Sequence, residues 1–247
     1  MTNNKVVILA AGRGSRLGRL TENLPKALLQ IGDSCCFESQ IQIYEALGFN
    51  DINVITGFKR ENFQKFSKIR KIYNPYWDVS NMLTSLIIGF ENGYSLINVI
   101  SYGDIVFEKA AVTKLMTSKH KISILYDINF LEYWNERTNN PISDLEELIM
   151  DPDGKIKKIG GKPTDLETIE GQYMGLLKVT AEGWQEIKEF IWNKRIQVVN
   201  KLSVTEFLSA FIQNGGSVYG VPFNGKWCEI DTERDLNIAR KKFSKII

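Results

Sequence analysis

The sequence of 247 residues carries 31 basic and 29 acidic residues, for a net charge of +2, and 43% of its residues are hydrophobic. Such a chain can bury the core of one α/β domain, so we expect a single domain over residues 1–247. The near balance of charge argues against a nucleic-acid-binding scaffold and favours small anionic ligands. The N-terminus has no apolar leader, and no stretch approaches the roughly 20 apolar residues of a membrane span. We therefore expect a soluble, cytoplasmic protein with no nucleic-acid or membrane partner.

Three cysteines and one histidine limit the chemistry that the chain can carry. Cys35 and Cys36 are adjacent and Cys228 is distant, a pattern that lacks CxxC spacing and makes a poor disulfide framework. We expect all three to be reduced and structural. His120 stands between two lysines, as a surface residue does, so a Ser-His-Asp triad or a multi-histidine zinc site is not expected.

Strands and helices alternate in the first half of the sequence. The apolar run Val6–Leu9 enters a glycine-rich turn, which is typical of an interior parallel strand. Apolar residues at spacings of four and three over 37–47, followed by Gly48, predict an amphipathic helix with a glycine stop. Further apolar runs at Ile52–Ile55 and Ile97–Ile100 predict two more strands. This order predicts a mostly parallel, doubly wound sheet flanked by helices, with ligands at the carboxyl ends of its strands.

The second half opens with a polar segment, about residues 127–171, whose turn signals predict a loop and a hairpin. We expect this segment to be a small insertion that covers the ligand site. Beyond it, apolar patterning predicts strands over 172–179 and 217–221, helices over 184–192 and 204–211, and a closing helix whose apolar face is Leu236, Ala239, Phe243 and Ile246.

Residues 9–17 read Leu-Ala-Ala-Gly-Arg-Gly-Ser-Arg-Leu, and Leu-Pro-Lys-Ala-Leu-Leu follows at residues 24–29. Glycine and alanine let the backbone approach a ligand closely, so that its amide groups can converge on anionic oxygens. Arginine suits forked hydrogen bonds to phosphate, and lysine supplies a compact charge that fits between two phosphoryl groups. The segment predicts a triphosphate site made of Leu9, Ala10, Ala11, Gly12, Arg13, Gly14, Arg16 and Lys26.

Other glycine loops fit this segment less well. A dinucleotide fingerprint that begins at Gly12 needs glycine at position 17, where Leu17 stands, and a Walker A loop needs a GxxxxGK[ST] pattern that the sequence lacks. A tight strand-to-helix turn with solvated arginines is the remaining alternative.

Two aspartates follow apolar strands far apart in the sequence. Asp104 comes after the strand at 97–100 in a Tyr-Gly-Asp segment, so we expect it and Gly103 beside the nucleotide at the carboxyl edge of the sheet. Asp231 lies between a short strand and the last helix. One or two carboxylates suffice for Mg²⁺, so this pair can hold one ion, with Glu229 as a weaker third candidate. The alternative is that Asp104 opens a turn and Asp231 supports the start of the helix.

The combination of LAAGRGSRL with PKALL resembles the signature of the sugar-1-phosphate and phosphocholine nucleotidyltransferases. The resemblance extends from the glycine loop to Asp231 and implies the Rossmann-like nucleotidyltransferase fold. It further implies that the loop from Gly12 to Gly14 holds triphosphate and base, that Arg16 assists the leaving pyrophosphate, and that Lys26 bridges the α-phosphate and the acceptor phosphate. The family places one aspartate in a Gly-Asp motif and another near the end of the chain, which matches Asp104 and Asp231 as Mg²⁺ ligands.

Two later segments look like parts of the phosphocholine cytidylyltransferase branch. Tyr73-Asn74-Pro75 matches its Asn-Pro segment and 81–86 its Asn-x-x-x-Ser-Leu segment, which implies CTP as the nucleotide. Asn81 and Ser85 are four residues apart, so on one helix face they can offer an amide and a hydroxyl to base or ribose. Helix capping around Ser80 is the alternative.

The acceptor is expected on the other side of the site. Tyr126-Asp127 and the segment 171–175 look like acceptor-binding segments of the same branch, and the acceptor-binding candidates are Tyr126, Gln172, Tyr173, Trp227 and Glu229. With Trp134, the aromatic members of this set can form a wall for a cationic head such as choline, although aromatic residues are more often part of a core. Arg137, Asp144 and Glu146 lie in the insertion and can bind an amino or carboxylate group, but a solvated loop is the simpler expectation.

The expected reaction is an in-line attack by an acceptor phosphate or phosphonate oxygen on the α-phosphorus of CTP, with Mg²⁺ as cofactor and pyrophosphate as leaving group. The nucleophile is already anionic, so no general base is required. Phosphocholine, 2-aminoethylphosphonate and phosphoglutamine are candidate acceptors, as in cell-surface polysaccharide or phosphonate biosynthesis. The alternatives are a sugar-1-phosphate nucleotidyltransferase that uses UTP or dTTP and a non-catalytic nucleotide-binding regulatory subunit. Because family members are often monomers or dimers, we expect a monomer or homodimer.

Overall fold

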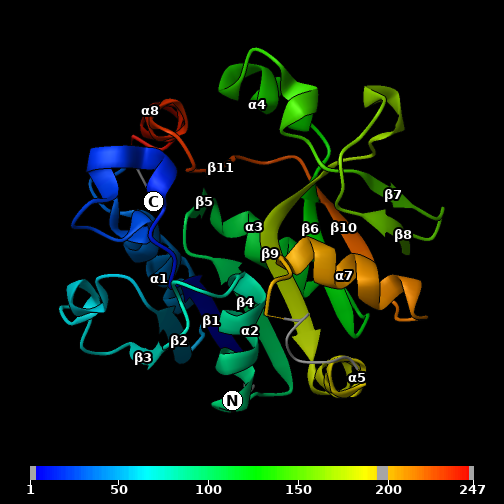
Figure 1. Cartoon of the computed structure of the whole chain (residues 1–247), viewed down its shortest axis with the longest axis horizontal. Helices are drawn as coiled ribbons and strands as arrows, with labels where there is room; N and C mark the ends of the chain where they lie inside the picture. Colours follow the sequence, from blue (N-terminus) through cyan, green and yellow to red (C-terminus); the bar gives the residue numbers. More distant parts are fainter. Residues whose placement is uncertain (1–3, 194–199, 245–247) are drawn as a thin grey trace.

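In the computed structural model, which describes residues 4–193 and 200–244, a central seven-stranded sheet carries helices on both faces (Figure 1). The strand order is β10-β6-β9-β4-β1-β2-β3. Pairing is parallel for β1 with β2 and β4, for β2 with β3 and for β6 with β10, whereas β9 runs antiparallel between β4 and β6. The predicted Rossmann-like, mostly parallel α/β sheet is confirmed. Its strands are β1 Asn4–Ala10, β2 Asp51–Thr56, β3 Arg70–Tyr73, β4 Ile97–Tyr102, β6 Ile122–Asp127, β9 Gln172–Thr180 and β10 Tyr219–Phe223.

Each face of the sheet has its own hydrophobic core. The first core contains α1 (Cys36–Ala46), α3 (Lys109–Met116) and α8 (Glu233–Lys242), and the second contains α2 (Met82–Glu91), α5 (Ala181–Trp192) and α7 (Val204–Gln213). In β1, Val6 and Ile8 belong to the first core and Val7 and Leu9 to the second, as the two-residue period of a strand dictates. Burial on both faces therefore explains why the sequence of β1 is an unbroken apolar run.

A short ribbon beside the main sheet brings distant parts of the chain together. It consists of β5 (Ile105–Phe107) and β11 (Trp227–Glu229), which pair antiparallel. The amide of Ile230 donates a 2.9 Å hydrogen bond to the carbonyl of Asp104, which extends the connection beyond the strands. In Figure 1, β11, α8 and α4 lie at the same end of the sheet. The ribbon thus joins the end of β4 to the segment that precedes α8.

The segment expected to hold a loop and a hairpin contains more structure than that. The hairpin is present as β7 (Leu148–Met150) and β8 (Ile156–Ile159), but α4 (Phe130–Arg137) precedes it and packs against α8. The expectation that Arg137 lies in a solvated loop is wrong, because its side chain is buried on the inner face of α4. The sequence does continue a helical apolar stripe at this point, and Arg137 occupies its last position.

The other elements that the sequence predicted are present with small shifts at their ends, whereas α3, β5 and β6 were not predicted individually. Strand β3 was not predicted, because it has only one buried apolar residue, Ile72, and lies at the edge of the sheet. Ile246, expected on the closing helix, lies outside the described residues. None of the helices in 4–193 and 200–244 has the length and apolar character to cross a membrane. Five short 3-10 helices complete the described fold: η1 Ser15–Thr21, η2 Lys26–Leu28, η3 Arg60–Phe63, η4 Pro141–Ser143 and η5 Leu166–Thr168.

Candidate active site

The loop after β1 forms one wall of a cavity of about 260 Å³. Gly14 has φ +72°, and a Cβ added there would lie 2.9 Å from the Cβ of Lys26, so glycine lets the lysine stem pass. The carbonyl of Gly14 accepts hydrogen bonds from the Thr21 hydroxyl at 2.8 Å and the Leu17 amide at 3.1 Å, which fix the turn. A Cβ on Gly12 would meet no protein atom within 4 Å. The fold does not require glycine at that position, whereas a ligand that approaches the backbone closely would.

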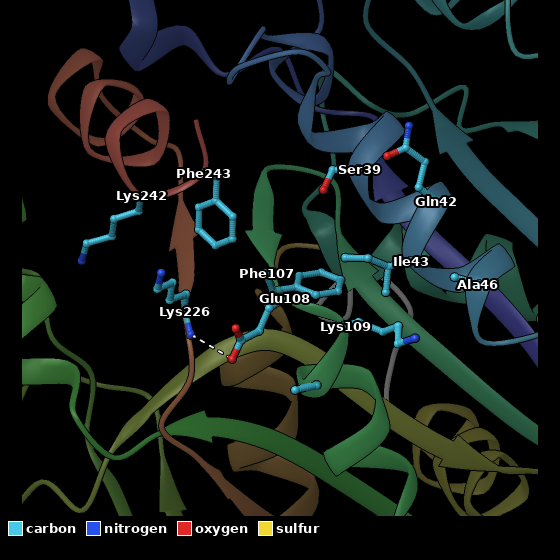
Figure 2. Close-up of a pocket in the computed structure, with 11 residues that line it drawn as sticks. Ser39, Gln42, Ile43, Ala46, Phe107, Glu108, Lys109, Lys226, Lys242 and Phe243 are labelled. Atoms are coloured by element: carbon cyan, nitrogen blue, oxygen red, sulfur yellow. Dashed lines mark hydrogen bonds between the residues drawn. The ribbon is translucent and has the colours of Figure 1, made fainter. Parts of the chain in front are cut away.

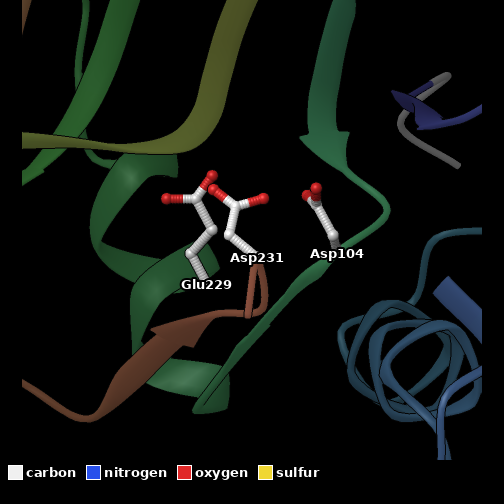
Figure 3. Close-up of side chains that lie close together, drawn as sticks. All are labelled: Asp104, Glu229 and Asp231. Atoms are coloured by element: carbon white, nitrogen blue, oxygen red, sulfur yellow. The ribbon is translucent and has the colours of Figure 1, made fainter. Parts of the chain in front are cut away.

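Three carboxylates lie close together at this cavity, and two of them line it. Asp104 follows β4, Glu229 ends β11 and Asp231 precedes α8, and one carboxylate oxygen of each lies within 4.8 Å of the others (Figure 3). Asp104 and Asp231, together with Lys26, line the same cavity as the glycine loop. The β5–β11 ribbon accounts for this convergence, because it aligns the residues that flank its two strands.

Lys26 lies between two of the carboxylates. Its ammonium group contacts Oδ2 of Asp104 and lies 2.7 Å from Oδ1 of Asp231, and all three side chains are at most 14% exposed. Arg16 reaches Oδ1 of Asp231 from the surface at 2.9 Å. Burial alone would lower the pKa of Lys26, but Asp104 and Asp231 raise it above its usual value, so this side chain is charged. Burial alone would raise the pKa of Asp231, but Lys26 and Arg16 lower it.

Glu229, the third carboxylate, is partly buried close to two other negative charges. Burial first, and then the charges of Asp231 and Asp104, raise the pKa of Glu229 to about 8. In the part of the chain that the structure describes, Oδ1 of Asp104 is buried and has no hydrogen-bond partner. A hard divalent cation would satisfy this oxygen and relieve the repulsion, and oxygen ligands are the type that Mg²⁺ prefers. The three carboxylates therefore fit a magnesium ion.

A buried glutamine on α1 holds the turn that carries Asp104. The side-chain amide of Gln40 donates 2.8 Å hydrogen bonds to the carbonyls of Tyr102 and Ile105, on either side of the turn. The hydroxyl of Ser101 donates to the side-chain oxygen Oε1 of Gln40 at 2.7 Å. Gln40 is completely buried. These bonds fix the backbone on both sides of Asp104, and Gln40 is a residue that the sequence did not single out.

Gly103 lies where the turn passes closest to β1. Its amide donates a 2.8 Å hydrogen bond to the carbonyl of Leu9, and an added Cβ would lie 2.8 Å from the Cβ of Ala10. Leu9, Ala10 and Gly103 all line the cavity, so three of the predicted nucleotide-binding residues lie at one point. Met82 also lines this cavity and was not predicted.

The other nucleotide-binding candidates lie around the cavity. Ala11 is buried and accepts a hydrogen bond from the amide of Phe58, and Arg13 is exposed with its guanidinium over the Phe58 ring. Asn81 is the N-cap of α2, where its side chain accepts from the Met82 amide and donates to the Lys201 carbonyl.

Ser85 is buried and accepts a 3.0 Å hydrogen bond from Asn74. The side chains of Asn81 and Ser85 thus have separate protein partners. The Asn-Pro segment and the Asn-x-x-x-Ser segment are instead joined to each other, through Asn74 and Ser85.

The acceptor candidates form two groups, one on β6 and β9 (Tyr126, Gln172 and Tyr173) and one on β11 (Trp227 and Glu229). Tyr126 and Tyr173 lie opposite each other in the register of β6 and β9, and the side chain of Gln172 is bonded to the backbone of Glu146. Trp227 is 4% exposed and its indole N–H donates to Asp127 at 2.8 Å. Glu229 joins the carboxylates already described.

Trp134 and Trp227 do approach each other, with ring centroids 6.1 Å apart. Tyr133 packs edge-on against both, with centroids 5.4 Å from each. The guanidinium carbon of Arg137 lies 4.8 Å from the ring centre of Trp134 and 5.3 Å from that of Tyr133. An aromatic group suited to a cation is therefore present, and a side chain of the protein already lies against it.

A larger cavity, of about 730 Å³, lies elsewhere (Figure 2). Residues of α1, the start of α3, Lys226 and the end of α8 line it, and the amide of Lys226 donates to Glu108 at its edge. It shares no lining residue with the first cavity and contains none of the predicted site residues. We therefore assign the candidate active site to the smaller cavity, where the glycine loop meets the carboxylates.

The chain is similar to several known proteins. Residues 6–143 match the family model of the MobA-like NTP transferase domain. Over 251 aligned residues the chain is 31% identical to a CTP:phosphoglutamine cytidylyltransferase of Campylobacter jejuni, an alignment that covers 96% of this chain and 99% of the relative. A choline-phosphate cytidylyltransferase of Streptococcus pneumoniae is 38% identical over 88 residues, which cover 34% of this chain and 38% of the relative.

Two solved structures have the same fold. The CTP:phosphocholine cytidylyltransferase from Streptococcus pneumoniae superposes with a TM-score of 0.73 at 22% identity, over 97% of this chain and 98% of the other. The inositol-1-phosphate CTP transferase from T. maritima has a TM-score of 0.76 at 19% identity, over 99% and 96% of the two chains.

Proposed function

The chain belongs to the MobA-like NTP transferase family, and we propose that it is a Mg²⁺-dependent cytidylyltransferase that transfers CMP from CTP to a small acceptor. The acceptor carries the attacking phosphate or phosphonate oxygen, and pyrophosphate is released. The observation that carries the proposal is the meeting of Lys26, Asp104 and Asp231 at the cavity lined by the glycine loop. Similarity over nearly the whole length to a CTP:phosphoglutamine cytidylyltransferase supports CTP and a small acceptor.

The chemistry needs only charge neutralisation and alignment. An acceptor oxygen attacks the α-phosphorus of CTP; the new P–O bond forms while the bond from the α-phosphorus to the bridging oxygen breaks, and pyrophosphate leaves with the electron pair. The glycine-loop amides bind phosphate oxygens, Lys26 neutralises charge at the α-phosphate, and Arg16, 66% exposed at the cavity, pairs with the leaving pyrophosphate. Asp104 and Asp231 would hold Mg²⁺, which when bound lowers the negative charge of the phosphates, and Glu229 is left to the acceptor.

The nucleotide base and the acceptor are assigned from the resemblance. We retain Asn81 and Ser85 as candidates for the base or ribose. We also retain segment 127–171 as the candidate cover over the acceptor. The residues that we propose to contact the acceptor are Tyr126, Gln172, Tyr173, Trp227 and Glu229. Three free, buried cysteines suit the expected cytoplasmic location.

Pyrophosphate release tests the proposal directly. The purified protein is assayed with Mg²⁺, each of the four NTPs and a panel of phosphoglutamine, 2-aminoethylphosphonate, phosphocholine, phosphoethanolamine and glucose 1-phosphate. We expect CTP and a small acceptor to react, and Asp104→Ala to abolish turnover without loss of fold. The matched control is Asp51→Ala. Asp51 is an exposed aspartate at the amino end of β2, whereas Asp104 follows the carboxyl end of β4.

Other outcomes would replace the proposal. Turnover of UTP or dTTP with glucose 1-phosphate would indicate a sugar-1-phosphate nucleotidyltransferase. Tight NTP binding without turnover of any acceptor would indicate a regulatory subunit. Full activity of Asp104→Ala would remove the carboxylate cluster from the mechanism.

A further inference from the structure

Helix α4 places the guanidinium of Arg137 against a group of aromatic side chains close to the carboxylates. Tyr133, Trp134 and Trp227, called the aromatic cage from here on, are each 4% exposed and pack against one another. Arg137 lies against Trp134 and Tyr133, and its own side chain is 5% exposed. Two cations of the protein thus already lie over its ring faces: Arg137 lies over Trp134 and Tyr133, and Nζ of Lys242 lies 4.7 Å from the ring centre of Tyr133.

Arg137 cannot leave the cage without exposing buried charge. Its Nε donates a 3.0 Å hydrogen bond to Oδ1 of Asp235, whose side chain is 2% exposed. The other oxygen of Asp235 accepts hydrogen bonds from the amides of Asp231 and Thr232 and from the Thr232 hydroxyl. Removal of the guanidinium would leave Asp235 without a compensating charge in the interior, which is strongly unfavourable. Arg137 is thus a fixed part of the site.

The carboxylates around Arg137 remain partly exposed. Nη1 of Arg137 lies 3.5 Å from Glu229 and 3.8 Å from Asp144, whose side chains are 27% and 45% exposed. Asp144 also accepts a hydrogen bond from the indole N–H of Trp134. Close to the cage, the groups open to a ligand are therefore carboxylate oxygens, whereas the ring faces are covered.

We propose that Arg137 is a specificity-determining residue, which closes the aromatic cage to quaternary ammonium groups and leaves a primary ammonium group of the acceptor to bind Asp144 and Glu229. A quaternary ammonium has no N–H to donate, so it depends on aromatic faces. A primary ammonium has three donors and is suited to carboxylates. This inference rests on the proposed function, because it concerns the acceptor of the same reaction.

The test compares two acceptors that differ only in methylation of the nitrogen, phosphoethanolamine and phosphocholine. Each is measured as an acceptor with CTP, and as a competitive inhibitor of whichever panel acceptor reacts. We expect the wild type to favour phosphoethanolamine by about 100-fold in kcat/KM or in inhibition constant. Arg137→Ala opens the cage and leaves its carboxylates uncompensated, so this ratio should fall at least about tenfold.

Arg234→Ala is the matched control. Arg234 is exposed and donates to the Glu136 carbonyl and to Asn139, so its loss removes a nearby positive charge without touching the cage. We expect it to leave the ratio unchanged. A purely structural role for Arg137 would lower activity toward both acceptors equally, which is why the ratio is measured.

The outcomes separate the two proposals. Equal use of phosphoethanolamine and phosphocholine by the wild type overturns the inference, and so does an unchanged ratio in Arg137→Ala. If Arg137→Ala does not fold, the preference of the wild type for phosphoethanolamine over phosphocholine alone tests the inference. Silence with every acceptor and every NTP overturns the proposed function and this inference with it.

Discussion

Lys26→Met removes the ammonium group between Asp104 and Asp231 but keeps an unbranched side chain. We expect the variant to bind divalent cations more tightly than the wild type and to lose turnover. The ammonium contacts Oδ2 of Asp104 and lies 2.7 Å from Oδ1 of Asp231, so the lysine and a bound metal ion would compete for the same oxygens. The substitution would end this competition and at the same time remove the charge that, in the proposed mechanism, neutralises the α-phosphate.

The size of the effect follows from burial. All three side chains are at most 14% exposed, and breaking a buried ion pair costs about 3–5 kcal/mol because a charge is left uncompensated. For a protein of this size, that loss lowers the metal-free Tm by roughly 6–20 °C. A divalent cation can then supply the missing charge, so we expect its affinity to rise at least about tenfold, equivalent to ~1.4 kcal/mol. Saturating Mg²⁺ should therefore raise the Tm of the variant more than that of the wild type.

Thermal unfolding and titration calorimetry with Mg²⁺, together with the pyrophosphate assay, measure the three quantities. Lys65→Met is the control, because Lys65 is 61% exposed and pairs with Glu38 at 3.6 Å on the surface, where ion pairs contribute little. Unchanged or weaker Mg²⁺ binding by Lys26→Met would refute the assignment of Asp104 and Asp231 as the shared ligands. Turnover close to that of the wild type would exclude Lys26 from the chemistry.

Three further predictions follow from the packing around the site. Gln40→Leu leaves two buried carbonyls beside Asp104 without a donor, at about 1–3 kcal/mol each, so we expect a lower Tm and a fall in kcat that exceeds any change in KM for CTP. Gly14→Ala should lower kcat strongly, because its Cβ would lie 2.9 Å from the Lys26 stem; Gly215→Ala, which shares the positive φ but meets no atom within 4 Å, should lower stability alone. Burial raises the thiol pKa of all three cysteines, so the native protein should react with a thiol reagent at pH 8 much more slowly than the unfolded protein; equal rates would refute their burial.

The parts of the site that could be predicted from sequence are those whose partners are near in sequence or lie at a strand end. The glycine loop and Lys26 occur within 18 residues, so their composition already indicates a phosphate site. Asp104 could be placed because ligands gather at the carboxyl edge of a parallel sheet. Asp231 was harder, since its approach to Asp104 depends on the β5–β11 ribbon, whose strands are three residues long and separated by more than 100 residues of chain.

The buried positions and the partners of Gln40 and Arg137 could not be assigned from sequence for a different reason, although Arg137 was named as a possible ligand for the acceptor. Both are polar residues at positions where a helix buries its apolar stripe, and Asp235, the partner of Arg137, is 98 residues away. A helical pattern predicts that such a position is buried, but it does not identify the groups that satisfy the side chain. A polar residue in a buried stripe therefore indicates a partner elsewhere in the chain, because a buried charge without a partner is strongly destabilising.

Asp235 ties the start of the last helix to both halves of the site. Asp235 is the N3 residue of the capping box of α8, in which Thr232 is the N-cap. Its Oδ2 accepts hydrogen bonds from the Thr232 amide and hydroxyl and from the amide of Asp231. Its Oδ1 accepts from Arg137, which lies beside Glu229. The same carboxylate that stabilises a helix N-terminus thus holds a metal-binding candidate in place and fixes the cation of the aromatic cage. Because one side chain makes all of these contacts, we expect a substitution of Arg137 to change the affinity for Mg²⁺ as well as the acceptor preference.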